Sequence, residues 1–410
     1  MTMKWVNVFH LYQPPHWNPA IIRRVARECY IPFFKFLVSH PKIRLTLNVT
    51  GSLTRQLEKL GYTTLLRDMT TVGKRKQAEF LASAMYHPIL PLIPASEVKR
   101  QITLNTETNR RVLGNWYKPE GFFPPEMAMD SRTAHLIASL GYRSMIVDEI
   151  SAHGDQRDRQ THIHRLRNTQ LRIAFRYRAA SDYIAFSATR RDLNRFVDLV
   201  TVGLHGDVLL TGMDGENLGH HRRVTAAFWY EVVRQPNIKT LTLADLMRQV
   251  RRDHDEPVEP RAGSWSTTED DLKHYVPYPL WHDPKNELHR LQWQLNDLIL
   301  KTIERAHKDP NYPKARHELD QTLSSDQYWW ASMKPWWSTD IVQNAALRSL
   351  ATLANLSTVG ENTRTRANQL AGTIIKKATE FQTSGEARRR RETYLHATHN
   401  IHFLGGQRVK

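Results

Sequence analysis

Two segments place carboxylate side chains where they could act on a bound molecule. Residues 121–128 read Gly-Phe-Phe-Pro-Pro-Glu-Met-Ala, so a proline pair ends an apolar strand just before Glu126, because proline cannot continue the hydrogen bonding of a central strand. Residues 214–221 form a glycine-rich loop that carries Asp214, Glu216, Asn217, His220 and His221. Carboxyl groups serve as nucleophiles and as general acids or bases. A helix-capping role for one of the loop residues is the structural alternative.

Three further segments carry side chains suited to binding a polar ligand. They are residues 9–15, with His10 and Gln13, residues 77–91, with Glu79 and His87, and residues 263–267, with Trp265. Histidine and glutamine exchange hydrogen bonds with hydroxyl groups, and an indole ring stacks on a flat apolar face. Structural readings remain open: His10 as a core histidine, Glu79 as the partner of an arginine, and Trp265 as a core side chain. No segment decides between these readings alone.

Alternating strands and helices must position these groups. Short apolar runs with strand character recur through the first two-thirds of the chain, at residues 5–9, 43–49, 79–82, 121–123, 144–147 and 207–210. Helical patterns lie between them, at residues 20–38, 96–113, 131–140 and 222–233. This rhythm predicts parallel βα units. In such folds chemistry gathers at the carboxyl ends of the strands, so we expect Glu126 and Asp214 to meet there.

The pattern changes near residue 261. Beyond it the apolar residues keep helical spacing, as at Leu288, Leu291, Leu295 and Leu298, which predicts an appended helical bundle. Residues 255–263 carry two prolines and a glycine among charged side chains. Such a segment interrupts a helix or a central strand and marks a domain boundary.

Composition limits the class of protein. The 410 residues include 40% hydrophobic and 24% charged residues, and no apolar run approaches the roughly 20 residues that span a bilayer, so we expect no membrane partner. The formal net charge is +17, but its densest run, Arg388 to Arg391, fits a solvated basic tail better than a specific nucleic-acid site. A salt-sensitive gel shift would detect nucleic-acid binding.

The cysteine content and the first residues bear on the compartment. Cys29 is the single cysteine, which excludes an intrachain disulfide and a multi-thiolate metal site. The chain enters a strand pattern at once, without the basic and then apolar segment of a secretory signal. We therefore expect a cytoplasmic protein.

The five segments, in this order and spacing, resemble the five sequence regions of glycoside hydrolase family 57. The resemblance covers nearly the whole chain and extends to residues 279–287 and 326–332. It implies an α/β fold, an incomplete (β/α)7 barrel followed by a C-terminal helical domain. We expect the barrel at residues 1–262, the helical domain, completing a substrate cleft, at 263–385, and a basic tail at 386–410.

The resemblance also implies roles for single residues. It makes Glu126 the nucleophile and Asp214 the general acid/base of a retaining glycosidase, and it places His10, Glu79, Glu216 and Trp265 along the substrate cleft. We add as substrate-binding candidates three polar residues of the same segments, namely Gln13, His87 and His220. No metal and no cofactor is expected. The family's commoner first motif is His-x-His-Gln-Pro, whereas this chain has Tyr12 at the second histidine, which leaves sugar binding at that position open.

The activity implied is retaining hydrolysis of α-glucans or maltooligosaccharides, α-amylase-like, at α-1,4 linkages, with α-1,6 linkages left open. The alternatives are a 4-α-glucanotransferase or a branching enzyme, which share the carboxylate pair. The chain is short for the extra β domain of some transferases, which favours hydrolysis. A non-catalytic glucan-binding protein is expected to lack one of the carboxylates. A metal-dependent deacetylase would need a His-x-x-x-His ligand set, which the sequence lacks. The sequence does not indicate an oligomeric state.

Overall fold

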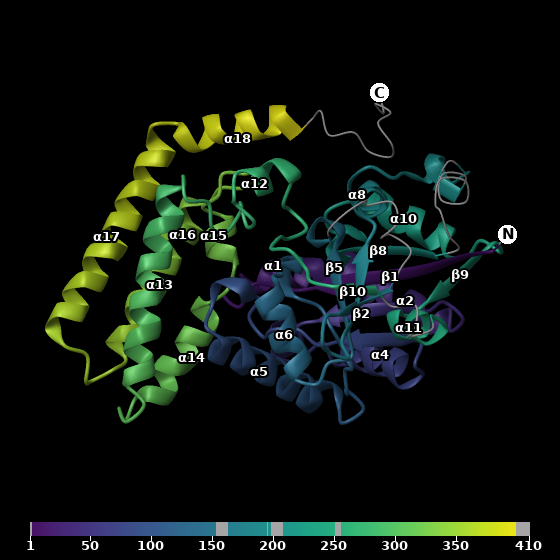
Figure 1. Cartoon of the computed structure of the whole chain (residues 1–410), viewed down its shortest axis with the longest axis horizontal. Helices are drawn as coiled ribbons and strands as arrows, with labels where there is room; N and C mark the ends of the chain where they lie inside the picture. Colours follow the sequence, from purple (N-terminus) through teal and green to yellow (C-terminus); the bar gives the residue numbers. More distant parts are fainter. Residues whose placement is uncertain (1, 153–162, 195, 198–207, 251–255, 399–410) are drawn as a thin grey trace. The chain divides into compact units, whose positions relative to one another are not determined.

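The structure is a computed structural model that describes residues 2–152, 163–194, 196–197, 208–250 and 256–398. The chain divides into two compact units, Met1–Trp265 and Ser266–Ile401. This division lies a few residues beyond the boundary that we expected after residue 262. The first unit contains all the described strands, and the second is helical among its described residues (Figure 1).

Parallel strands form the centre of the first unit. Seven of the described strands that run in the same direction form this centre, and they are β1 (Met3–Leu11), β2 (Leu45–Val49), β3 (Ala78–Leu81), β4 (Gly121–Phe122), β5 (Ser144–Asp148), β7 (Arg172–Arg176) and β8 (Val208–Asp214). They are ordered β3-β2-β1-β8 in one sheet and β7-β5-β4 in another. A parallel bridge between Ala82 and Phe122 joins β3 to β4, and the Tyr177 amide donates to the Leu210 carbonyl at 2.7 Å between β7 and β8. The expected incomplete (β/α)7 barrel is therefore confirmed.

Three short strands extend this arrangement. They are β6 (Ile163–Leu166), antiparallel to β7, β9 (Ile238–Leu241), parallel to the start of β1, and β10 (Glu256–Val258), parallel to β6. The sequence analysis did not single them out. Strand β10 contains Pro257, which the edge of a sheet tolerates because one side of an edge strand forms no ladder.

Strand β1 carries the core of the barrel. It is buried along nearly its whole length, as expected for a parallel strand covered on both faces. Trp5 and Phe9 belong to the core under the helices, whereas Val6 and Val8 belong to the core inside the barrel. The buried indole of Trp5 donates to the Thr211 hydroxyl of β8 at 2.9 Å, which fixes the two strands beside each other.

Helices cover the outside of the barrel. They are α1 (Pro19–Val25), α2 (Ile31–Ser39), α3 (Gly51–Lys59), α4 (Thr63–Lys74), α5 (Ala95–Leu113), α6 (Ser131–Ser139), α8 (Arg178–Phe186), α10 (Arg223–Val232) and α11 (Leu243–Gln249). The helix expected at residues 20–38 is present, but a π-helical turn, η1 (Ala26–Tyr30), separates α1 from α2. Turns of this kind insert one residue into a helix and often occur at functional sites.

The second unit is a bundle around three long helices. Its helices are α12 (Glu269–Lys273), α13 (Glu287–Arg305), α14 (Tyr312–Thr322), α15 (Asp326–Trp329), α16 (Thr339–Ala354), α17 (Glu361–Thr383) and α18 (Glu386–Thr398). Helices α13, α16 and α17 pack on one another through small and aliphatic side chains such as Leu295, Ala346 and Ile374.

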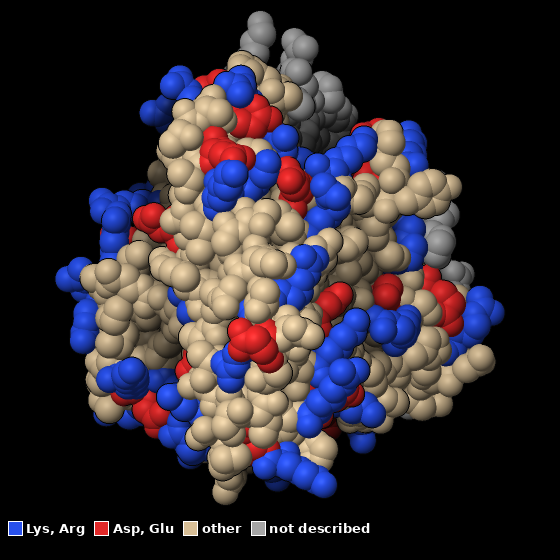
Figure 2. All heavy atoms as spheres, turned by 90° about the vertical axis from the view of Figure 1, so that its left-hand side faces the viewer, with Lys and Arg blue, Asp and Glu red and all other residues tan. Residues whose placement is uncertain are grey.

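Helix α18 occupies residues that we expected to belong to a basic tail. Its arginines pair with acidic residues one turn away, Arg390 with Glu386 at 2.6 Å and Arg388 with Glu392 at 2.8 Å. Such i,i+4 pairs support an exposed helix, and they explain why this basic segment is ordered as a helix. Figure 2 shows basic side chains interspersed with acidic ones on one face of the molecule.

Within the described residues, no helix has both the length and the apolar composition that crossing a bilayer requires.

Gly219 offers a test of the barrel's packing. Its φ is +125°, and a Cβ there would lie 2.4 Å from the Glu28 carbonyl oxygen, whereas Gly61, with φ +79°, has nothing within 4 Å. We expect Gly61→Ala to lower the free energy of unfolding by about 1 kcal/mol, and Gly219→Ala by at least about 2 kcal/mol more, because backbone atoms must move as well. Urea denaturation measures both, and equal losses would contradict the close approach of η1 to this loop.

Candidate active site

His10, at the carboxyl end of β1, lies inside a stack of rings. Its ring centroid is 4.7 Å from that of Phe123 and 4.8 Å from that of His87, with the planes nearly parallel. His10 Nδ1 lies 2.7 Å from Asn48 Oδ1, and Asn48 Nδ2 donates to the Leu81 carbonyl at 3.2 Å, which turns the amide oxygen towards the ring. His10 Nδ1 is therefore the donor.

Burial decides the charge of His10. It lowers the pKa of His10 to about 4, although the hydrogen bond with Asn48 opposes this shift. Because burial also lowers the pKa of His87 well below its usual range, both rings are neutral at pH 7. His10 Nε2 has no hydrogen-bond partner among the described residues. As an unprotonated nitrogen, it can accept a hydrogen bond from a ligand hydroxyl.

Glu126 follows β4 in a strained turn. Its φ is +57°, a region that costs a residue with a side chain energy and that occurs preferentially at functional sites. The Trp265 indole Nε1 donates to Glu126 Oε2 at 2.7 Å, and His87 Nδ1 lies 3.6 Å from Glu126 Oε1. His87 also has a positive φ, +57°. The Trp265 indole thus holds the carboxylate, with the His87 ring beside it, and the carboxylate remains partly exposed.

Asp214 ends β8 opposite His10 of β1, its partner in the strand register. Burial raises the pKa of Asp214 to about 6, against the lowering effect of the Arg176 charge. Burial also raises the pKa of Glu216 to about 8, and the Asp214 charge adds to that rise. Because each of these carboxyl groups affects the other, the pair titrates as one unit and retains a proton at neutral pH.

Glu216 is buried among hydrogen-bond donors. The Tyr30 hydroxyl, Gln13 Nε2 at 3.3 Å and the Tyr12 amide at 3.3 Å all donate to Glu216 Oε1. Tyr30 is the last residue of the π-helical turn η1. The preceding Cys29 donates its thiol hydrogen to the Gly215 carbonyl at 3.1 Å. The turn therefore fixes the loop that follows Asp214.

Packing brings the Glu126 turn against β8. A Cβ on Gly212 of β8 would lie 2.8 Å from the Met127 methyl group, so the glycine makes room for the residue after Glu126. The Trp265 ring meets those of His10 and Phe123 edge-on, with centroids 6.2 and 6.0 Å apart. The structure thus brings His10, His87, Glu126 and Trp265 together at the carboxyl edge of the barrel where Asp214 also lies.

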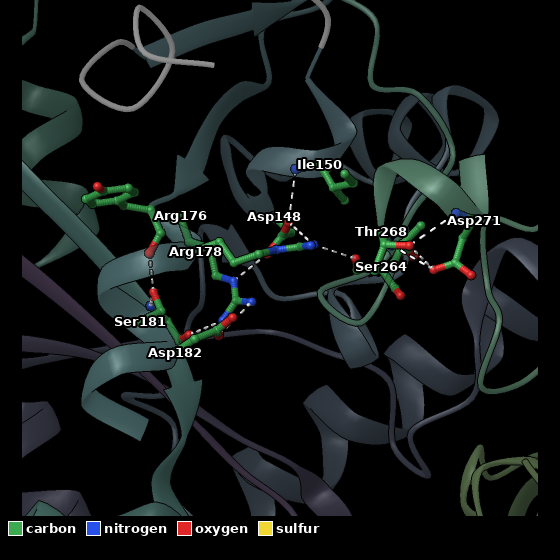
Figure 3. Close-up of polar contacts among 12 residues, drawn as sticks. Asp148, Ile150, Arg176, Arg178, Ser181, Asp182, Ser264, Thr268 and Asp271 are labelled. Atoms are coloured by element: carbon green, nitrogen blue, oxygen red, sulfur yellow. Dashed lines mark hydrogen bonds and ion pairs between the residues drawn. The ribbon is translucent and has the colours of Figure 1, made fainter. Parts of the chain in front are cut away.

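A buried charge network lies at the same edge, and the sequence analysis missed it. Asp148, at the end of β5, is fully buried and accepts hydrogen bonds from Arg176 Nε at 2.5 Å and from Arg178. Figure 3 shows both guanidinium groups converging on this carboxylate. Coulombic attraction from the two arginines lowers the pKa of Asp148 despite its burial. The sequence offers one signal for this network, because Asp148 directly follows the apolar run at residues 144–147.

Glu79 and His220 make contacts elsewhere. Glu79 Oε2 accepts from the Ala244 amide at 2.7 Å and from the Thr46 hydroxyl at 3.2 Å, near the amino ends of β2 and β3. Burial raises the pKa of Glu79 to about 7. His220 Nδ1 lies 2.6 Å from Glu28 Oε2 on η1. These described contacts of Glu79 lie at the opposite end of the strands from Glu126.

Among the described residues, no group of three or more His, Cys, Asp or Glu side chains is arranged to hold a metal ion.

Comparison with known proteins identifies relatives. A family model described as Glycosyl hydrolase family 57 matches residues 2–257. Alpha-amylase 1 of Dictyoglomus thermophilum is 26% identical over 141 residues, which are 34% of this chain and 20% of that protein. The 4-alpha-glucanotransferase of Thermococcus litoralis is 25% identical over 142 residues, or 34% of this chain and 21% of that protein. The matched part spans about a fifth of the length of these curated relatives.

A solved structure resembles most of the chain. A family 57 branching enzyme from Pyrococcus horikoshii superimposes with a TM-score of 0.69 at 15% identity, over 92% of this chain and 97% of that one. Similarity at this level of identity establishes the shared fold.

The Asp214 and Glu216 pair yields a titration test. In the wild type, carbon-13 NMR of labelled carboxyl groups should show two steps, because the pKa values of the pair lie at about 6 and about 8. In Glu216→Gln the upper step should vanish and the Asp214 step should remain, since the amide carries no proton to lose. A pair that is fully ionised at pH 5, or an upper step that survives the substitution, would contradict this description.

Proposed function

The chain belongs to glycosyl hydrolase family 57, and from this premise we propose that it is a retaining glycoside hydrolase acting on α-glucans in an α-amylase-like manner. Glu126 is the nucleophile and Asp214 the general acid/base in this proposal. The observation that carries it is the contrast between two carboxyl groups at one edge of the barrel. Both side chains are partly exposed, but Glu126 accepts a hydrogen bond from the Trp265 indole on its carboxylate, whereas loss of solvation raises the pKa of Asp214 to about 6 and so favours its protonated form.

This contrast suits a double-displacement reaction. A carboxylate attacks the anomeric carbon while a carboxylic acid protonates the departing oxygen, and the second group then removes a proton from water. A carboxyl group retains its proton for this step when its pKa is raised towards the working pH. The strained turn of Glu126 supports the assignment, because such strain is kept where it aims a functional group.

The surrounding residues support sugar binding. His10 offers a neutral nitrogen acceptor, and the Trp265 ring, partly exposed, offers a face for a sugar ring as well as its bond to Glu126. Three further substrate-binding candidates lie beside these groups. Gln13 donates a hydrogen bond to Glu216, and the His87 ring stacks on His10 and lies 3.6 Å from Glu126. We keep Glu79 and His220 as candidates that act indirectly. Glu79 acts through its contacts near the amino ends of β2 and β3, and His220 acts through its contact with Glu28 of η1. The substrate in this proposal is an α-glucan or maltooligosaccharide, and the location is the cytoplasm.

Transfer to a sugar acceptor is the second candidate. The relatives include a 4-alpha-glucanotransferase and a branching enzyme, and both reactions use a covalent glycosyl intermediate that either water or a sugar hydroxyl can resolve. A non-catalytic glucan-binding protein is less well supported, because Glu126 and Asp214 are both present.

Incubation with maltoheptaose, followed by chromatography of the products, tests the proposal. Hydrolysis gives only shorter chains, transfer gives longer ones as well, and the absence of any product would favour a binding protein. Glu126→Gln should fold and lose turnover by several orders of magnitude. Glu120→Gln, at a glutamate with 69% side-chain exposure, is the matched control and should retain wild-type activity.

Asp214→Asn separates the role of acid from that of nucleophile. We expect a large loss on maltoheptaose and a much smaller loss on an aryl α-maltoside, because a good leaving group needs little protonation. Equal losses on both substrates would argue against Asp214 as the acid.

A further inference from the structure

Arg176 is a buried cation that ties together the strands carrying the two carboxyl groups. It ends β7, and only 3% of its surface is exposed. Its Nε donates to Asp148 at 2.5 Å, its Nη1 donates to the Gly212 carbonyl of β8 at 2.7 Å, and its Nη2 lies 3.4 Å from Asp182 Oδ1. A buried charge needs such partners, because removing it from water is expensive. The guanidinium group therefore occupies one fixed place.

The Arg176 guanidinium group lies over the ring of Trp265. The central carbon of Arg176 is 5.5 Å from the centroid of the Trp265 ring, within the range of a cation–π contact. The same ring donates its Nε1 hydrogen to Glu126 Oε2 at 2.7 Å. The orientation of Arg176 thus bears on the orientation of the hydrogen-bond donor that holds Glu126.

The charge of Arg176 also acts on Asp214. Among the described residues, Arg176 of β7 and Glu216 of the following turn act on Asp214 electrostatically. His10 of β1 is its partner in the strand register, and Asp182 belongs to α8, which packs on β8 and contacts Arg176. His10 is neutral at pH 7 because burial lowers its pKa to about 4. Arg176 lowers the pKa of Asp214. The positive charge of Arg176 therefore limits the rise in the pKa of Asp214 that burial causes.

We propose that Arg176 is a positioning residue that couples the two carboxyl groups: it orients the indole that bonds Glu126, and it supplies the positive charge facing Asp214. This inference rests on the proposed function. The planar guanidinium group of arginine, with its fixed N–H donors, orients the indole, and its charge acts on Asp214. Lysine keeps the charge but loses the planar fork and the flat face, so the two tasks can be separated by substitution.

Two variants of Arg176 and two matched controls test the proposal. Arg176→Lys should lower kcat by on the order of 10²-fold through misplacement of Glu126. In the pH profile of kcat/KM, the basic limb, which reports the deprotonation of Asp214 in our proposal, should stay nearly unmoved. Arg176→Met should move that limb to higher pH, because the pKa of Asp214 rises when the cation is removed. Asp148 keeps its bonds from Arg178 and the Ile150 amide in both variants, which favours folding.

Arg172→Lys and Arg172→Met are the controls. Arg172 is also buried on β7, but it donates to the Met247 and Val250 carbonyls at the other end of the strand. These variants should leave the basic limb in place and retain most of kcat. A basic limb in Arg176→Met that coincides with that of the wild type, or an equal loss of kcat in Arg172→Lys and Arg176→Lys, would overturn the proposal.

A readout independent of activity separates this inference from the proposed function. Carbon-13 NMR titration of Asp214, assigned with Asp214→Asn, should show a higher pKa in Arg176→Met than in the wild type. An unshifted titration would overturn the role of the charge, whether or not the protein cleaves glucans. A wild type that shows this shift on substitution but forms no product would overturn only the proposed function.

Discussion

The burial of several charged side chains at one edge of the barrel is the constraint on which the first unit depends. An unpaired buried charge costs several kcal/mol, so each one must meet a partner supplied by another strand or helix. Asp148 of β5 meets Arg176 and Arg178, and Arg176 reaches the Gly212 carbonyl of β8. These bonds connect β5, β7 and β8 through residues that are 28 and 36 positions apart in the sequence. They also give the carboxyl edge of the barrel a fixed electrostatic environment.

The same burial gives neighbouring groups different protonation states. Asp148 is ionised because two arginines surround it, whereas the partly exposed Asp214 and the buried Glu216 meet less positive charge and keep a proton between them. His10 and His87 lose their protons because both are buried in a ring stack. An acid, a set of neutral hydrogen-bonding rings and a partly exposed carboxylate thus arise from one packing arrangement. In our proposal these are the parts that a retaining glycosidase needs.

Much of this arrangement could be predicted from the sequence, because the motifs lie at strand ends. The proline pair before Glu126 and the apolar run before Asp214 indicate strand ends, and the structure has both residues at the carboxyl ends of strands. The order of the motifs identified the family. The buried contacts of Arg176 could not be predicted, because strand β7 begins and ends with arginine and lacks the apolar signal of a buried strand. The π-helical turn could not be predicted either, because residues 26–30 continue the helical sequence pattern of the residues before and after them. The contacts of Glu79 depend on α11, which is distant in the sequence.

The central claim is that Glu126 attacks the anomeric carbon directly and that Asp214 serves as acid and then as base. Such a double displacement preserves the configuration of the anomeric carbon. Proton NMR of the first product released from an α-glucan, recorded before mutarotation, measures that configuration. The account predicts the α anomer. Initial release of the β anomer would contradict it, because inversion requires a water molecule between the two carboxyl groups and excludes a glycosyl intermediate on Glu126.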